Sequence, residues 1–404
     1  MDGAGPVTIS FVRILRNPHV TTAPAGATTT AVPVGLPAGA LRAPRSLHRL
    51  VKAYAPTRLV DVPSIAERTG LGRVLVKHEL NRFGLPAFKI IGASWATYRV
   101  LAARYAAVHG AAPEATSFAA LCAAFSEFGD LTLVTATDGN HGRAVARAAA
   151  WFGLGADIYM PAGTVEARVR AIESEGARVT VVDGDYDLAV ATAAATASAD
   201  RLVISDTSWP GYTEVPTWIA EGYATIFGEI DRQVFDAVDS SVPDAIVIPV
   251  GVGAFLQAAL DHYPAGPPDG PVRIAVEPLA ADCLYRSLEA GEPVTVPGPH
   301  DSMMAGMNCG TVSMIAWPTM RDRTDWAVAI EDAYAADAMR LLADAGLVVG
   351  ETGAGTVGAL LAIADASPAS FADMGLGPDS TVVCVCTEGA TDPVNYGRIV
   401  GTAP

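Results

Sequence analysis

The sequence predicts an α/β protein with two open, twisted, mostly parallel sheets flanked by helices. Short runs rich in Val, Ile and Leu alternate with Ala-rich stretches along most of the chain. Strands that are continuously apolar are typical of parallel sheets buried on both faces by helices. The 404 residues exceed one ordinary core, and the strand–helix units form two groups. We therefore expect two such sheets.

The first elements follow from composition and pattern. Residues up to about Pro44 are rich in Ala, Thr, Gly and Pro, which predicts an irregular or partly extended arm with one strand within residues 5–15. The apolar run "RVLVKHE" predicts a strand over 73–79, and the apolar stretch that follows predicts a helix from about Phe88.

The remaining elements repeat one unit, a β-branched run followed by an Ala-rich helix that often stops at glycine or a polar turn. Strands are expected at 131–136, 156–161, 177–183, 245–250, 272–278 and 381–386. Helices are expected to begin near Asn140 and Glu214 and to cover 164–176, 186–199 and 253–260.

Charge and hydropathy exclude two classes of function. The net charge is −16, whereas a nucleic-acid binder needs clustered Lys and Arg. The longest apolar run, 245–260, holds a Pro and two Gly and is too short to span a bilayer. The first residues show no basic segment followed by an apolar one. We expect a cytoplasmic protein that binds neither nucleic acid nor membrane.

The cysteines predict buried free thiols and no metal site. There are five, at positions 122, 283, 309, 384 and 386, with no spacing typical of zinc ligands. Cys384 and Cys386 lie two apart on an expected strand and should share one face.

Lys89 is the first candidate for chemistry. The chain has only three lysines, Lys52, Lys77 and Lys89, and the neighbours of Lys89 are apolar on both sides. An amine in apolar surroundings loses hydration, and its pKa falls, so that neutral amine is available near neutral pH. Drift from Lys to Arg explains the scarcity of lysine but not the place of Lys89.

Two turns between strand and helix could bind anionic groups. "TATDGNHG" (135–142) contains Asp138 and Asn140 at the start of a helix, where backbone N–H groups can meet an anion. An ordinary capped turn explains "DGN" alone better, but the eight consecutive residues are much more specific. "PVGVGAF" (249–255) places Gly251, Val252, Gly253 and Ala254 where they could hold one phosphate, but it lacks the third glycine of a dinucleotide fingerprint.

Two further segments complete the candidate site. "CTEGATDP" (386–393) follows a strand, and ligands bind at the carboxyl ends of strands in such sheets, where Thr387 offers a neutral hydroxyl. "SDTSWPGYTEVPTW" (205–218), with Asp206, is dense in the residues of binding loops. Alone, 386–393 is better explained as a surface turn near the C-terminus, and 205–218 is also compatible with a packed loop.

Together these features are what pyridoxal 5'-phosphate (PLP) requires: a lysine for the Schiff base, a loop for the phosphate and a polar turn for the ring hydroxyl or a carboxylate. The residues alone leave open a sugar-phosphate or nucleotide enzyme that uses the glycine loop.

The segments "RFGLPAFKIIGASWATYRVL", "TLVTATDGNHGRAVA", "SDTSWPGYTEVPTWI" and "CTEGATDPVNYGRIV" resemble those of diaminopropionate ammonia-lyases, which are fold type II (tryptophan synthase β-like) PLP enzymes. The similarity runs from about Leu50 to Val400. It implies two α/β domains with PLP in the interdomain cleft, here 1–93 with 209–404 as the large PLP-binding domain and 94–208 as the small one, and a homodimer.

The resemblance also implies roles for single residues. By position, Lys89 corresponds to the Schiff-base lysine, Asp138 to an acid/base residue and Asp206 to an acid near the distal amine of the substrate. Asn140 corresponds to the residue that faces the ring hydroxyl, and Thr387 to the hydroxyl beside the pyridine nitrogen. Gly251, Val252, Gly253 and Ala254 correspond to the phosphate loop.

The chain departs from the family at Pro86, where Asn is more frequent, and at Ala93, where Gly is common. These departures concern the substrate more than the cofactor.

The reaction that the resemblance implies is α,β-elimination on the amino acid 2,3-diaminopropionate, through an external aldimine and an aminoacrylate, giving pyruvate and ammonia. Lys89 and Asp138 on opposite faces would let one site accept both enantiomers. Three alternatives stay open: a serine or threonine dehydratase, a β-replacement enzyme of a biosynthetic pathway, and a non-catalytic member that binds PLP.

Overall fold

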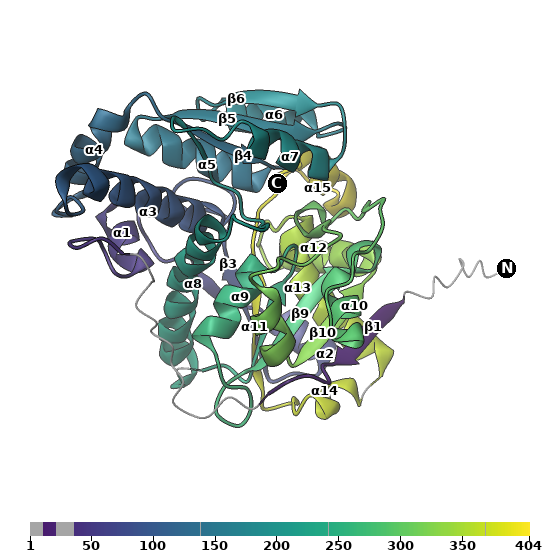
Figure 1. Ribbon diagram of the computed structural model, residues 1–404. Helices are drawn as coiled ribbons and strands as arrows, with labels where there is room; N and C mark the ends of the chain where they lie inside the picture. The colour runs from purple at the N-terminus through teal and green to yellow at the C-terminus, as the bar shows by residue number, and fades with distance from the viewer. Residues whose placement is uncertain (1–10, 22–35, 138, 241, 368) are drawn as a thin grey trace.

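The computed structural model describes residues 11–21, 36–137, 139–240, 242–367 and 369–404. Within them the predicted fold class is confirmed, with two sheets flanked by helices (Figure 1). None of the described helices is long and apolar enough to cross a membrane.

The larger sheet has seven strands in the order β1-β10-β9-β8-β11-β3-β2. Its inner strands are parallel, while β1 and β2 are antiparallel to their neighbours at the two edges. The strands are β1 (Val12–Arg16), β2 (Leu59–Asp61), β3 (Arg73–His78), β8 (Ala245–Pro249), β9 (Val272–Pro278), β10 (Trp326–Ile330) and β11 (Thr381–Cys386).

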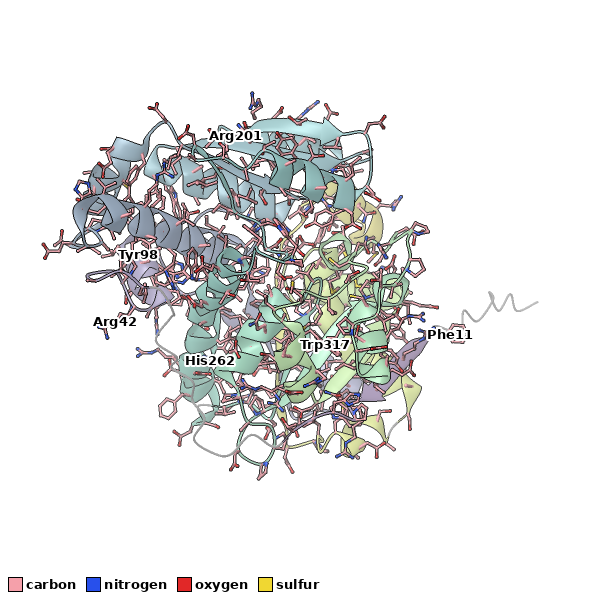
Figure 2. The ribbon with its side chains drawn as sticks, in the orientation of Figure 1. Phe11, Arg42, Tyr98, Arg201, His262 and Trp317 are labelled. Atoms are coloured by element: carbon pink, nitrogen blue, oxygen red, sulfur yellow. The ribbon has the colours of Figure 1, made fainter. Side chains whose placement is uncertain are left out.

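The smaller sheet has four parallel strands in the order β6-β5-β4-β7 and lies at the top of Figure 1. The strands are β4 (Thr132–Ala136), β5 (Gly155–Pro161), β6 (Arg178–Val182) and β7 (Arg201–Val203). Arg201, labelled in Figure 2, lies in β7 and pairs with Asp157 of β5 at 2.6 Å.

The helices flank both sheets. They are α1 (Pro44–Leu50), α2 (Pro63–Thr69), α3 (Ile90–His109), α4 (Phe118–Phe125), α5 (Asn140–Phe152), α6 (Glu166–Glu173), α7 (Tyr186–Ala195), α8 (Glu214–Val238), α9 (Ala254–His262), α10 (Cys283–Ala290), α11 (Trp317–Arg323), α12 (Asp332–Asp344), α13 (Glu351–Ala366), α14 (Ser370–Asp373) and α15 (Pro393–Val400). Short 3-10 turns lie at Ser126–Phe128, Leu279–Ala281 and Ala305–Met307.

The two faces of the larger sheet are separate cores, as side-chain alternation along a strand requires. On β11, Val383 and Val385 pack with α3, α8 and α9, whereas Val382, Cys384 and Cys386 pack with α2, α12 and α13. Cys384 and Cys386 therefore share one buried face, as predicted. All five cysteines are free, but Cys122 and Cys309 are only half-buried, so the prediction of buried thiols is wrong for these two.

The arm folds back onto the helices at its described end. The backbone N–H of Leu41 donates to the Tyr98 hydroxyl on α3 at 2.8 Å, and Figure 2 labels Tyr98. The predicted strand in the arm corresponds to β1, and its residues 5–10 lie outside the described part of the chain.

Candidate active site

The segment between β3 and α3 places Lys89 at the carboxyl end of the central strands. Glu79 N donates to the carbonyl of Cys386 at 2.9 Å, and Phe88 N donates to the carbonyl of Thr387 at 3.2 Å. A reversal between these contacts uses Phe83 and Gly84, with φ of 55° and 79°. The segment therefore crosses the end of β11, and Lys89 follows as the residue before α3.

A buried ionic cluster holds this reversal in place. Arg82 donates to Glu79 at 2.6 Å and to Glu229 of α8 at 2.8 Å, and Lys77 also donates to Glu229 at 2.8 Å. Burial alone would raise the pKa of Glu229, but Arg82 and Lys77 outweigh it and lower the pKa to about 2. The carboxylate is thus charged and fully paired, which a buried charge requires.

Of the three lysines, only Lys89 combines burial with access to ligands. Lys52 is exposed. Lys77 is fully buried, and its Nζ donates to Glu229, to the Gln233 side chain and to the Thr57 carbonyl. The Lys89 side chain retains 24% of its exposure.

Asp206 faces Lys89. Lys89 Nζ donates to Asp206 Oδ2 at 2.7 Å, and His141 Nδ1 lies 3.8 Å from the same oxygen. Burial alone would raise the pKa of Asp206, but the His141 ring and the Lys89 ammonium hold it well below its usual range. Asp206 is therefore a carboxylate at every physiological pH. The contacts also bring together residues of three segments that the sequence marked.

Glycines let α8 approach α3 directly behind Lys89. A Cβ on Gly222 would lie 2.7 Å from the Cα of Gly92, and one on Gly92 would lie 2.7 Å from the Tyr223 ring. Tyr223 also packs on Phe88, with ring centroids 4.8 Å apart. The start of α3, and with it Lys89, is fixed by this close crossing.

The glycine turn after β8 lies beside the Lys89 segment. Phe255, the second residue of α9, packs on Phe88 with ring centroids 4.4 Å apart. Gly253 has φ of 105°, a backbone conformation that favours glycine, and a Cβ there would also lie 2.4 Å from Met320 Sδ. The carbonyl of Val252 accepts from Ser313 N at 2.7 Å, which orients the turn.

The loop with Asp206 also reaches the glycine turn. Ser208 Oγ and Ser313 Oγ are 2.8 Å apart, so that Ser313 contacts the turn with its backbone and the loop with its side chain.

Asn140 begins α5 and faces the larger sheet. Its Nδ2 donates to Glu388, the residue after Thr387. A cavity of about 230 Å³ opens beside it, lined also by Pro86, Gly139, Arg143 and Arg168. Asp138 lies outside the described residues.

Thr387 and Tyr223 carry buried hydroxyls without a hydrogen-bond partner among the described residues. A buried hydroxyl without a partner costs free energy, which a ligand that hydrogen-bonds to it recovers. The residues present therefore fit PLP: an amine, a helix N-terminus behind a glycine turn, an amide, and a hydroxyl with an unused hydrogen bond.

Sequence reasoning did not single out Glu388, Ser313 or Tyr223. Glu388 lies within a segment that the sequence marked, but nothing local shows that its carboxylate reaches Asn140, 248 positions earlier. Nothing local to Ser313 or Tyr223 shows the contacts that they make, and only the packing reveals them.

Comparison with known proteins adds the family. Residues 50–388 match the pyridoxal-phosphate dependent enzyme family. The diaminopropionate ammonia-lyase of Escherichia coli K12 is 36% identical over 365 residues, covering 88% of this chain and 90% of that protein. The biosynthetic L-threonine dehydratase of Mycobacterium leprae is 28% identical over 278 residues, covering 66% of this chain and 58% of that protein.

Solved structures agree. The crystal structure of the Escherichia coli diaminopropionate ammonia-lyase with an aminoacrylate-PLP azomethine reaction intermediate matches with a TM-score of 0.83 at 32% identity, and the match covers 97% of each chain. Maize serine racemase matches with a TM-score of 0.67 at 20% identity, over 88% of this chain and 94% of that one, and shows the shared fold alone.

Proposed function

This chain belongs to the pyridoxal-phosphate dependent enzyme family, and from that premise we propose that it is a diaminopropionate ammonia-lyase. The reaction joins one molecule of 2,3-diaminopropionate and one of water to give pyruvate and two molecules of ammonia. The observation that carries the proposal is the contact of 2.7 Å between Lys89 and Asp206, in a chain similar to ammonia-lyases of this kind over 88% of its length.

The cofactor is pyridoxal 5'-phosphate. When bound, it supplies an electron-withdrawing ring that takes up the charge left by the Cα proton. We propose that Lys89 holds its aldehyde carbon, that residues 251–254 hold its phosphate through backbone N–H groups, and that Asn140 and Thr387 hold the ring hydroxyl and the ring nitrogen.

Thr387 supports elimination through its chemistry. A hydroxyl is a neutral partner for the pyridine nitrogen, so the nitrogen stays uncharged and the ring withdraws electrons less strongly. Weaker withdrawal favours loss of the β-substituent over transamination. The hydrogen bond that Thr387 leaves unused supports this role.

Asp206 selects the substrate in this proposal. The β-amino group leaves as ammonia and therefore has to be protonated, and a carboxylate that stays ionised binds an ammonium through charge-assisted hydrogen bonds. Lys89 is one base for the Cα proton, and Asp138 is proposed as the base on the opposite face, which would admit both enantiomers.

We also propose that residues 1–93 and 209–404 form the large domain and residues 94–208 the small one, and that the protein is a cytoplasmic homodimer. The resemblance to the family supports these points. Light scattering on the purified protein measures the mass of the assembly directly.

One set of measurements tests the function. Visible absorbance is recorded before and after diaminopropionate is added, and keto-acid release is assayed with diaminopropionate, serine and threonine separately. We expect visible absorbance that diaminopropionate changes, and pyruvate from diaminopropionate faster than from serine. Faster turnover of serine or threonine would make the protein a dehydratase, and absorbance without turnover a binding protein.

Lys89→Ala extends the test to the residue. We expect it to abolish the visible absorbance and to lower turnover by more than about 10³-fold, because the amine both holds the cofactor and moves a proton. Lys52→Ala is the matched control, since Lys52 is exposed, and should change neither quantity. Absorbance and turnover that survive in Lys89→Ala would show that the amine is assigned wrongly.

A further inference from the structure

We propose that Glu388 is a positioning residue that fixes the orientation of the Asn140 side-chain amide at the cofactor ring. This inference rests on the proposed function, because it presupposes that PLP occupies the site. It adds a residue to which no role has been assigned, and it explains how a side chain from the smaller sheet is held against a ring bound at the larger one.

The position of Glu388 is set by its backbone. Its carbonyl accepts from Gly350 N at 3.0 Å, and the residue forms an isolated bridge with Ala87. A Cβ on Gly353 would lie 2.9 Å from the same carbonyl. The start of α13 and the segment before Lys89 thus enclose Glu388 on two sides, and the residue is 3% exposed.

The Glu388 carboxylate meets three donors. Oε1 accepts from the backbone N–H of Thr352 at 3.2 Å, in the first turn of α13, where the helix dipole stabilises negative charge. Oε2 accepts from Asn140 Nδ2 and, at 3.4 Å, from Thr391 Oγ1. The carboxylate is held by an element of the larger sheet and reaches across to the first residue of α5.

The Glu388 carboxylate sets the orientation of the Asn140 amide, because a carboxylate only accepts hydrogen bonds. The two ends of an asparagine amide have nearly the same shape, and a neighbouring group determines which end points where. Glu388 accepts only from the NH₂ end. That end is thereby held at the strand end that carries Thr387 and Glu388, and its second N–H is available to a ring oxygen.

Two neighbouring residues after β11, Thr387 and Glu388, provide the two polar contacts of this arrangement. Thr387 offers an unused hydroxyl, and Glu388 holds the amide from the opposite sheet. Side chains alternate along an extended backbone, so the two point to different sides. One peptide unit thus sets both polar partners that we assign to the ring.

A double-mutant cycle tests the coupling. PLP is titrated into apoprotein of the wild type, Asn140→Ala, Glu388→Gln and the double variant, and the dissociation constant and the visible absorbance maximum are recorded. We expect each single variant to weaken PLP binding by about tenfold, or 1.4 kcal/mol. Glu388 acts through Asn140, so the double variant should bind no more weakly than Asn140→Ala. Both single variants should shift the absorbance maximum in the same direction.

Thr391→Val is the matched control. It replaces the hydroxyl that makes the weaker contact of 3.4 Å to the same carboxylate oxygen with a methyl group, and should leave the dissociation constant within about twofold of the wild-type value. If Glu388→Gln does not fold, Glu388→Asp takes its place in the cycle, because it keeps the charge at α13 and shortens the reach to Asn140.

The results separate this inference from the function. The role of Glu388 is overturned if the double variant loses PLP affinity by the product of the two single losses. It is also overturned if a Glu388 variant keeps the wild-type affinity and spectrum. In both cases PLP binding itself stands. Wild-type protein that binds no PLP overturns the proposed function instead.

Discussion

The hydroxyl of Thr387 is buried without a hydrogen-bond partner among the described residues, which is unfavourable in the protein without cofactor. Thr387→Val replaces the hydroxyl with a methyl group of similar size. We expect the free energy of unfolding of the apoprotein to rise by about 1 kcal/mol. We expect PLP affinity to fall by about tenfold. Chemical denaturation and PLP titration measure the two opposite effects.

Thr356→Val is the control for this pair of effects. Thr356 is also fully buried, but its hydroxyl donates to the Gly353 carbonyl at 3.2 Å, so its loss should lower stability and leave PLP affinity nearly unchanged. A Thr387→Val apoprotein that is less stable than wild type would show that the hydroxyl has a partner in solution.

Asp206 is the residue on which substrate choice depends in our proposal. Asp206→Asn removes the charge but keeps the size, and the amide also presents an N–H to the Lys89 amine. We expect kcat/KM for diaminopropionate to fall at least about tenfold more than that for serine, because serine has no β-ammonium to pair. Steady-state kinetics with both substrates give the ratio. Equal losses would remove Asp206 from substrate choice.

Scarcity marked Lys89, because the chain has three lysines, whereas the role of Asp206 came from the resemblance of its loop to the family. The roles of both residues stay predictions. Their contact could not be predicted, since it joins positions 117 apart through the packing of two sheets. The role of Glu388 has no local signal, because a glutamate after a strand is ordinarily exposed.

At the level of elements, α8 contains two glycines six positions apart in different surroundings. Gly222 touches Gly92, whereas nothing lies within 4 Å of a Cβ on Gly228. We expect Gly222→Ala to lower the free energy of unfolding by about 2 kcal/mol and to weaken PLP binding, because α3 and Lys89 must shift. Gly228→Ala should raise stability by up to about 1 kcal/mol through helix propensity.

Thermal or urea unfolding of both variants, with PLP titration, makes the comparison within one helix. A Gly222→Ala protein of wild-type stability would mean that the crossing adjusts without cost, and that Lys89 does not depend on it.

The elements that the sequence predicted are present, because they depend on local periodicity, but nine of the described helices, α1, α2, α4 and α10 to α15, were not predicted. Helices α3, α5 and α8 begin at or within two residues of the expected positions, and all the expected strands of both sheets are present. The strands β2, β7 and β10 were not predicted. Two of them have only three residues, and their pairing with neighbouring strands defines them more than their sequence does.

For the whole molecule, two buried groups give opposite dependences of stability on pH. His48 is fully buried, and burial lowers its pKa to about 3, so the unfolded chain binds its proton first and stability falls as pH drops from about 6.5 towards 3. Burial raises the pKa of Glu277 to about 8, so the folded chain keeps that proton and stability falls as pH rises from about 4.5 towards 8.

Removing either group should expose the slope of the other. Between pH 4.5 and 6.5 the two terms oppose each other, each at about 1.4 kcal/mol per pH unit at most. In this range the free energy of unfolding of His48→Gln should fall more steeply with rising pH than that of the wild type. That of Glu277→Gln should instead increase with rising pH. Urea unfolding at pH 5 and 6.5 gives both slopes. Parallel curves for the three proteins would contradict the assignment.

The global arrangement could be predicted only in outline. Continuous apolar strands predicted two covered sheets, which the structure confirms. The ionic cluster of Lys77, Glu79, Arg82 and Glu229 could not be foreseen, because it brings α8 against a reversal about 150 positions earlier and its residues show no pattern of their own.

The alternation of side chains at the end of β11 limits how this protein can change in length. One residue inserted or deleted within 381–388 would exchange the sides to which Thr387 and Glu388 point. The hydroxyl would then point to the side where the carboxylate now lies, and the carboxylate to the side of the hydroxyl. Length variation among related chains should therefore gather in the connection before Thr381 and be absent from these eight positions. A homologue with a gap there should have lost the cofactor.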